Sequence, residues 1–123
     1  MTGSVLVVDD SGLARRRARN ILETAGYSVM EAEDGMAALE RYFVDRPDVV
    51  LLDLVMKGMY GLDVLTKLRE MDPGARVIVV SADVQTSSHE LVAAAGAAGF
   101  LIKPVDEGDM LALVESALRE KQK

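Results

Sequence analysis

The chain has 123 residues, half of them hydrophobic, and carries a formal net charge of -6. This length suits one hydrophobic core, so we expect residues 1–123 to form a single domain. The acidic balance argues against a general nucleic-acid binder, which needs a basic surface to release counterions from phosphates. There is no cysteine, and the first apolar segment is too short for a signal peptide or a membrane span. We therefore expect a cytoplasmic protein, away from membranes, whose partners are proteins or small ions.

Short apolar runs alternate with segments of helical spacing along the chain. Strands are expected at residues 5–8, 27–32, 49–53, 77–80 and 99–102, the second being the most polar. Helices are expected at residues 11–25, after Asp34, from Gly61, from Ser87 to Gly96, and from Asp106. Ser11, Asp34 and the pair Ser87 and Glu90 are the expected N-terminal caps. The helix after Asp34 carries the apolar residues Ala38, Leu39, Tyr42 and Phe43.

Five strands alternating with five helices predict right-handed crossovers and a mostly parallel sheet with helices on both faces. The most apolar strands belong in the centre and the polar second strand at an edge, which gives the order 2-1-3-4-5. The first and third strands are then neighbours at the switch point. The expected fold class is α/β, a doubly wound (βα)5 sandwich that binds ligands at the carboxyl edge of its sheet.

Polar residues close four of the expected strands. Asp9 and Asp10 follow the first strand, Asp53 ends the third, Ser81 follows the fourth and Lys103 follows the fifth. Each has a structural explanation of its own: a turn pair for the two aspartates, a cap or turn for Asp53, a cap for Ser81, and a solvated charge for Lys103. Because the carboxyl ends of parallel strands share one edge, we expect these side chains to converge on one pocket.

This set of side chains indicates phosphate chemistry. Clustered carboxylates repel one another unless a cation offsets them, and oxygen ligands without a histidine or cysteine cluster favour Mg²⁺, or Mn²⁺. Such an ion bridges a carboxylate and a phosphoryl oxygen, while a lysine and a hydroxyl take the remaining charge of an in-line transfer. Asp53 is the expected nucleophile because a carboxylate is already ionised at neutral pH.

Over essentially its full length the chain resembles the receiver domains of bacterial two-component response regulators, especially the stand-alone chemotaxis type. The resemblance rests on Asp9-Asp10, Leu51-Leu52-Asp53-Leu54, Ser81-Ala82 and Lys103-Pro104 at the proper intervals. Receiver domains are flavodoxin-like and share the 2-1-3-4-5 order, so this resemblance and the expected strand order are not independent.

The resemblance implies a role for each residue at that edge. Asp53 would accept a phosphoryl group from a sensor histidine kinase or a phosphotransfer protein, and Ser81 and Lys103 would bind the phosphoryl oxygens. The implied metal ligands are the side chains of Asp9, Asp10 and Asp53 and the main-chain carbonyl of Val55. Lys103-Pro104 is commonly a cis bond in this family. The domain would catalyse only its own phosphoryl transfer and hydrolysis, and is not an enzyme toward other substrates.

The resemblance also implies a conformational switch. Phe100 occupies the switch-aromatic position, and it would follow Ser81 when the phosphoryl group draws that hydroxyl inward. Phosphorylation would then shift the population between two pre-existing arrangements. The expected output is a changed surface formed by residues 84–96, Phe100 and the C-terminal helix, which would bind a downstream protein target.

A few residues depart from the commonest pattern of the family. Lys57 stands where a proline usually precedes Gly58, and Tyr60 where an acidic or small residue is frequent. Val55 and Asp83 occupy positions that tune the lifetime of the phosphoryl group. Because an apolar Val55 cannot orient an attacking water, we predict slower hydrolysis than with a polar side chain there.

Two features outside the site have alternative explanations. Arg15, Arg16, Arg17 and Arg19 form a basic patch on the first helix, which is either a solvated face or a docking surface for the kinase. His89 is expected on an exposed helix face without a ligand role.

Two other classes of function fit less well. A phosphatase that uses an aspartyl phosphate usually needs a second aspartate two residues after the nucleophile, where this chain has Val55. A flavodoxin-like electron carrier needs a Ser-, Thr- or Gly-rich loop after the first strand, where Asp9-Asp10 would repel a flavin phosphate.

Overall fold

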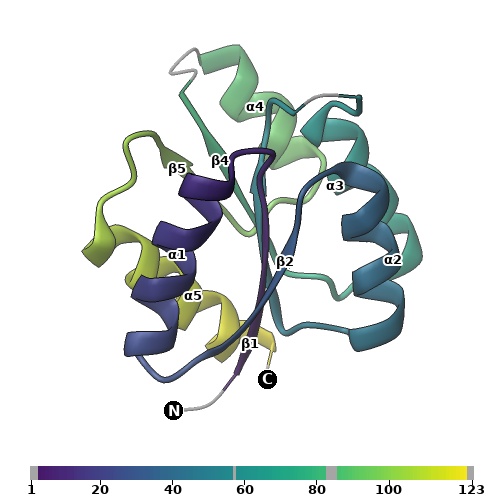
Figure 1. Ribbon diagram of the computed structural model, residues 1–123. Coiled ribbons are helices and arrows are strands. Elements are labelled where there is room, and N and C mark those ends of the chain that lie inside the picture. The colour runs from purple at the N-terminus through teal and green to yellow at the C-terminus, as the bar shows by residue number, and fades with distance from the viewer. Residues whose placement is uncertain (1–2, 57, 83–85, 122–123) are drawn as a thin grey trace.

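A computed structural model describes residues 3–56, 58–82 and 86–121. In these ranges five strands and five helices alternate along the chain (Figure 1). The strands are β1 (Ser4–Val8), β2 (Ser28–Ala32), β3 (Val49–Asp53), β4 (Val77–Ser81) and β5 (Gly99–Ile102). The helices are α1 (Gly12–Thr24), α2 (Gly35–Asp45), α3 (Gly61–Met71), α4 (Thr86–Ala94) and α5 (Glu107–Lys121). Each element expected from the sequence is therefore present.

All four strand pairings are parallel, and the order is β2-β1-β3-β4-β5. This confirms the predicted order and the doubly wound α/β fold class. In the register of the sheet, Asp53 lies beside Val80, and Ser81 lies beside Ile102. The carboxyl ends of β1, β3, β4 and β5 therefore meet along one edge.

The sheet separates two buried clusters of side chains. One lies under α1 and α5, and the other under α2, α3 and α4. Figure 1 shows α1 and α5 together on one side of the strands, and α2 and α3 on the other. All residues of β3 and β4 are buried, whereas the edge strand β2 exposes Ser28. A continuous apolar run suits a central strand because both of its faces are covered.

Most of the predicted helix caps are confirmed. The Ser11 hydroxyl accepts a hydrogen bond from Ala14 N at 3.2 Å, and the Asp34 carboxylate accepts one from Ala37 N at 2.8 Å. Asp106 caps α5 in the same way, accepting from Asp109 N at 3.0 Å. Each such cap stabilises a helix by about 1 kcal/mol. They fix where the helices begin next to the carboxyl edge of the sheet.

One local prediction is wrong. Helix α4 begins at Thr86, so Ser87 lies inside the helix and is not its N-cap. Phe43 is 66% exposed, whereas Ala38 and Tyr42 are fully buried. Successive residues of an α-helix are rotated by about 100°, so Phe43 points away from the face that Tyr42 buries. Among the described residues, the structure contains no helix with the length and apolar character needed to span a bilayer.

Candidate functional site

The three acidic side chains predicted at the carboxyl edge lie together. Asp9 follows β1 and Asp53 ends β3, and these two strands are paired neighbours. One carboxylate oxygen from each of Asp9, Asp10 and Asp53 lies within 4.8 Å of the others. Asp9 and Asp53 are each only 6% exposed, whereas Asp10 is open to solvent. The cluster is therefore a half-enclosed site with one open side.

Lys103 lies between two of these carboxylates. Its Nζ is 3.2 Å from Asp9 Oδ2 and 3.5 Å from Asp53 Oδ2. The Lys103 N–H donates to the carbonyl of Ser81 at 2.9 Å, and the Lys103–Pro104 peptide bond is cis. The structure thus brings Lys103 to the place that the strand order predicts, and the cis bond that the resemblance implied is present.

Burial and like charge disturb the titration of Asp53. Burial, followed by the charge of Asp9, raises the pKa of the Asp53 carboxyl, and the nearby Lys103 ammonium only partly opposes this rise. Burial disfavours the charged form of Lys103 as well, but the attraction of Asp53 and Asp9 outweighs it, so the pKa of Lys103 is raised. The Lys103 ammonium thus offsets the charges of Asp9 and Asp53 only in part, which favours further positive charge at the site.

The donor set of this site fits a small, hard cation. Three carboxylates supply only oxygen ligands, and the exposure of Asp10 leaves space for the water ligands that Mg²⁺ retains. Asp9 is also held in place: its Oδ1 accepts from Ser11 N at 2.9 Å, and its main-chain oxygen accepts from Arg15 Nη1 at 2.6 Å. Such supporting contacts orient a ligating carboxylate.

The other predicted site residues surround this cluster at different depths. Ser81 is buried at the end of β4, one residue after Val80, the partner of Asp53 in the sheet, and its carbonyl accepts from Lys103 N. Val55 N lies 3.5 Å from Asp53 Oδ1, while the main-chain carbonyl of Val55 as a metal ligand stays a prediction. Lys57 and Asp83 lie outside the described residues.

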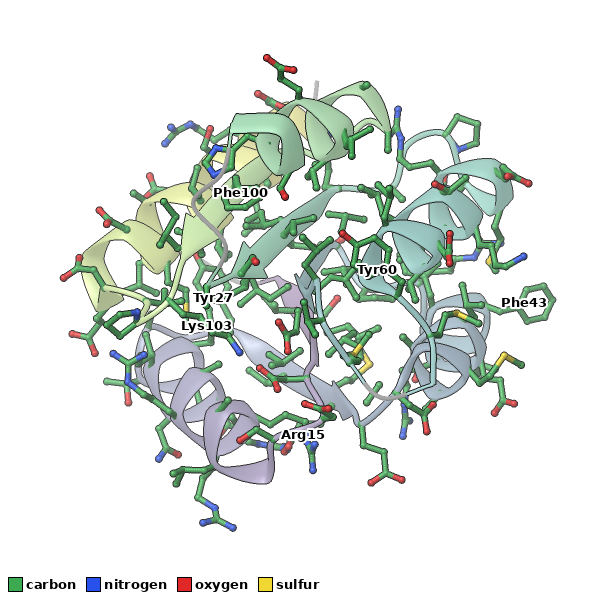
Figure 2. The ribbon with its side chains drawn as sticks, turned by 90° about the horizontal axis from the view of Figure 1, so that it is seen from above. Arg15, Tyr27, Phe43, Tyr60, Phe100 and Lys103 are labelled. Atoms are coloured by element: carbon green, nitrogen blue, oxygen red, sulfur yellow. The ribbon has the colours of Figure 1, made fainter. Side chains whose placement is uncertain are left out.

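Phe100 lies on the α4 side of β5, away from the carboxylates. Its side chain packs into the cluster under α2, α3 and α4 and contacts the ring of His89. Figure 2 shows Phe100 beside α4, whereas Lys103 lies nearer to α1. The implied switch residue therefore lies on the α4 side of the sheet, whereas Lys103, after the end of the same strand, reaches the carboxylates of Asp9 and Asp53.

A cavity of about 540 Å³ adjoins the acidic site. Asp9, Asp53 and Lys103 line it together with Arg17 and with apolar residues of β1, β3, β4 and α5. The acidic site therefore continues into a cavity between α1, the sheet and α5.

Three contacts of α1 were not expected from the sequence. Arg15 and Arg19 both pair with Glu31, at 3.0 Å and 2.6 Å, and Arg17 Nη2 donates to the Val105 carbonyl at 2.8 Å. In the sequence the four arginines look alike, since they all lie mainly off the apolar stripe of the helix. Only the register of β2 and the path of the β5–α5 loop decide which arginine finds a partner.

The fold and the site together define a flavodoxin-like α/β domain with a carboxylate and lysine cluster at its switch point. Residues 5–115 match the family model of the response regulator receiver domain. The chain therefore belongs to the response regulator receiver domain family, the receiver class of two-component signalling.

Relatives with curated names point the same way. The chain is 39% identical over 101 residues to the chemotaxis protein CheY of Thermotoga maritima, covering 81% of this chain and 84% of that protein. It is 34% identical over 119 residues to the chemotaxis protein CheY of Bacillus subtilis, covering 96% and 99%. A CheY-like receiver domain protein from Methanospirillum hungatei JF-1 superposes with a TM-score of 0.93 at 26% identity, covering 99% and 98%. The resemblance and the fold class are thus confirmed.

Proposed function

We propose that residues 1–123 act as one phosphorylation-activated receiver that accepts a phosphoryl group on Asp53 in a Mg²⁺-dependent reaction. The observation that carries this proposal is the Lys103 ammonium, 3.5 Å from Asp53 within a cluster of three carboxylates. A salt bridge between Lys103 and Asp53 alone would not explain the carboxylate of the exposed Asp10 at the same place. A site for a metal and a phosphoryl group needs all of these side chains.

The proposed reaction is an in-line transfer to a carboxylate. An oxygen of Asp53 attacks the phosphorus of a phosphohistidine, the P–N bond breaks, and the imidazole leaves with the electron pair. Lys103 and the hydroxyl of Ser81 stabilise negative charge on the phosphoryl oxygens. Asp9, Asp10 and Asp53 would hold Mg²⁺, or Mn²⁺, which supplies further positive charge at those oxygens when bound. The domain would act only on its own phosphoryl group, with no other substrate.

The proposed donor is a sensor histidine kinase or a phosphotransfer protein in the cytoplasm. Its docking surface would be the N-terminal part of α1, around Arg16. In the part of the chain that the structure describes, Arg16 makes no hydrogen bond or ion pair, whereas Arg15 and Arg19 are paired with Glu31. Arg16→Glu should then slow transfer from a kinase but not from a small phosphodonor, with the exposed Lys67→Glu of α3 as control. Equal rates for Arg16→Glu and wild type from the kinase would reject this surface.

The proposed output surface is formed by α4, β5 and α5. Leu91 on α4 and Ile102 on β5 are large apolar side chains that remain exposed, which suits a protein target better than solvent. Of the predicted region 84–96, residues 84 and 85 lie outside the described residues. A change at Phe100 would alter this surface, because Phe100 contacts His89 on α4.

Intact-mass measurement tests the proposal. Wild type, Asp53→Ala and Asp53→Asn are incubated with Mg²⁺ and a small phosphodonor such as an acyl phosphate. We expect one phosphoryl adduct on the wild type and none on either variant. An adduct that persists in both variants would refute Asp53 as the acceptor. Absence of any adduct on the wild type would indicate a receiver that works without phosphorylation.

A further inference from the structure

Helix α1 holds the loop that carries Lys103, through Arg17. The Arg17 Nη2 donates to the main-chain oxygen of Val105 at 2.8 Å, a contact between residues 88 positions apart. Val105 is buried and is separated from Lys103 only by Pro104, whose ring fixes one backbone dihedral. A shift of the Val105 carbonyl is therefore transmitted to Lys103 through a short and stiff segment.

The other end of this segment is fixed as well. The Lys103 N–H donates to the Ser81 carbonyl at 2.9 Å, which attaches Lys103 to the end of β4. Pro104 has no N–H to add a further main-chain hydrogen bond. Two hydrogen bonds thus hold the main chain around Lys103. One joins the Lys103 N–H to Ser81 of β4, and the other joins Arg17 of α1 to the Val105 carbonyl.

The same helix also holds the partner of Lys103 in the site. Arg15 Nη1 donates to the main-chain oxygen of Asp9 at 2.6 Å. Residues two positions apart on a helix point to different sides, so Arg15 reaches the end of β1 while Arg17 reaches the β5–α5 loop. Both members of the 3.2 Å pair between Lys103 and Asp9 are therefore attached to α1, whose buried Ala18 and Leu22 anchor it on the sheet.

We propose that Arg17 is a positioning residue for Lys103, and this inference rests on the proposed role of Lys103 in phosphoryl transfer. The hydrogen bond from Arg17 to Val105 keeps the Lys103 ammonium between Asp9 and Asp53. Arg17 is exposed and its guanidinium donates to the main chain of the loop, so its replacement opens no cavity in the core. Without it the loop relaxes, and the ammonium spends less time where the phosphoryl oxygens arrive.

The rate of phosphorylation by a small phosphodonor with Mg²⁺ tests this inference. Arg17→Met removes the guanidinium and keeps an unbranched side chain, and Arg41→Met, at an exposed arginine of α2, is the matched control. Loss of a hydrogen bond from a charged donor should slow the reaction of Arg17→Met about tenfold, with partial recovery in Arg17→Lys. Arg41→Met should react like the wild type. Equal rates for Arg17→Met and wild type would overturn the inference.

A second comparison asks whether Arg17 acts through Lys103. In a Lys103→Met background, Arg17→Met should have little further effect, because coupled residues are not additive. The same slowing in both backgrounds would show that Arg17 acts independently of Lys103, against the inference.

Hydrogen exchange provides a readout that needs no phosphorylation. Amides of residues 99–110 should exchange faster in Arg17→Met than in the wild type, and at the wild-type rate in Arg41→Met. If the wild type accepts no phosphoryl group, the proposed function fails, and hydrogen exchange alone then decides whether Arg17 holds this loop. Unchanged exchange in Arg17→Met would overturn the inference in either case.

Discussion

The ring of His89 lies on the ring of Phe100, with 3.8 Å between the centroids and a tilt of 31°. His89 comes from α4 and Phe100 from β5, so the stack joins two elements of the proposed output surface. The prediction that His89 lies on an exposed face is wrong, because this contact leaves it half-buried. Its Nε2 is buried and, within the described part of the chain, has no hydrogen-bond partner. The favourable contact between the rings therefore has to offset the cost of burying the unpaired Nε2.

Two substitutions separate packing from polarity at His89. His89→Ala should lower the free energy of unfolding by about 1 kcal/mol, the typical contribution of a ring pair. His89→Leu should lower it less, because leucine fills the space and removes the unpaired nitrogen. Urea denaturation measures both, with the exposed neighbour Glu90→Ala as control. A leucine variant less stable than the alanine variant would contradict this view of the stack.

Neutralising Asp53 should stabilise the protein when no divalent ion is present. Burial and the charge of Asp9 raise the pKa of Asp53, so the folded state binds this proton more tightly than the unfolded state does. The resulting stability is full below the ordinary pKa of 3.8 and is lost as pH rises through the folded-state pKa. At neutral pH, Asp53→Asn should therefore unfold at higher urea concentration than wild type, even though Lys103 then keeps only Asp9.

The pH dependence provides the control for this prediction. The advantage of Asp53→Asn should shrink as the pH falls and Asp53 of the wild type becomes protonated. A variant that is less stable at neutral pH, or an advantage that does not change with pH, would contradict the assigned electrostatics.

Magnesium should stabilise the folded domain through the three carboxylates. A ligand that binds only the folded state adds about 2.7 kcal/mol at a concentration one hundred times its Kd. Thermal unfolding with Mg²⁺ and with a chelator should show this difference in the wild type. Asp10→Asn should lose most of this stabilisation, because it removes one of the three carboxylates. Asp10 is exposed, so its replacement leaves the core intact. Glu40→Gln, an exposed acid on α2, is the matched control and should keep the full shift.

A polar side chain at position 55 should shorten the life of the phosphoryl group. Val55 is 65% exposed, and its N–H lies 3.5 Å from Asp53 Oδ1, so its side chain stands in solvent close to the acceptor. An amide at this position can orient a water toward the phosphorus, which valine cannot do. The phosphoryl half-life of Val55→Asn should be shorter than that of wild type. Val44→Asn, at a 76% exposed valine of α2, should leave the half-life unchanged. A longer half-life in Val55→Asn would refute the prediction.

The fold and the acidic cluster could be predicted because they depend on patterns that the chain carries locally. The apolar run before Asp53 must be covered on both faces, which places its strand at the centre of a parallel sheet. Once the strand order is known, the ends of β1 and β3 meet, and Asp9 and Asp53 come together without any knowledge of side-chain conformation. Caps such as Ser11 and Asp34 need only a few residues of context.

The contacts that could not be predicted join side chains from distant elements. Arg17 reaches Val105 because of the path that the chain takes after β5, and His89 meets Phe100 because of the rotation of α4 over the sheet. No periodic pattern or motif in the sequence indicates either the path of the chain after β5 or the rotation of α4. Phe43 and Tyr42 are neighbours in the sequence and both are aromatic, yet only Tyr42 is buried. The rotation of the helix about its axis decides which of the two faces the core.

The central claim is that Asp53 is the residue that becomes phosphorylated. The domain is incubated with Mg²⁺ and a small phosphodonor and then treated with borohydride, which reduces an aspartyl phosphate to homoserine. Peptide mass spectrometry then locates the reduced residue. We predict homoserine at position 53, with aspartate retained at positions 9 and 10. Homoserine at position 9 or 10 with Asp53 intact, or no reduced residue at all, would contradict this assignment.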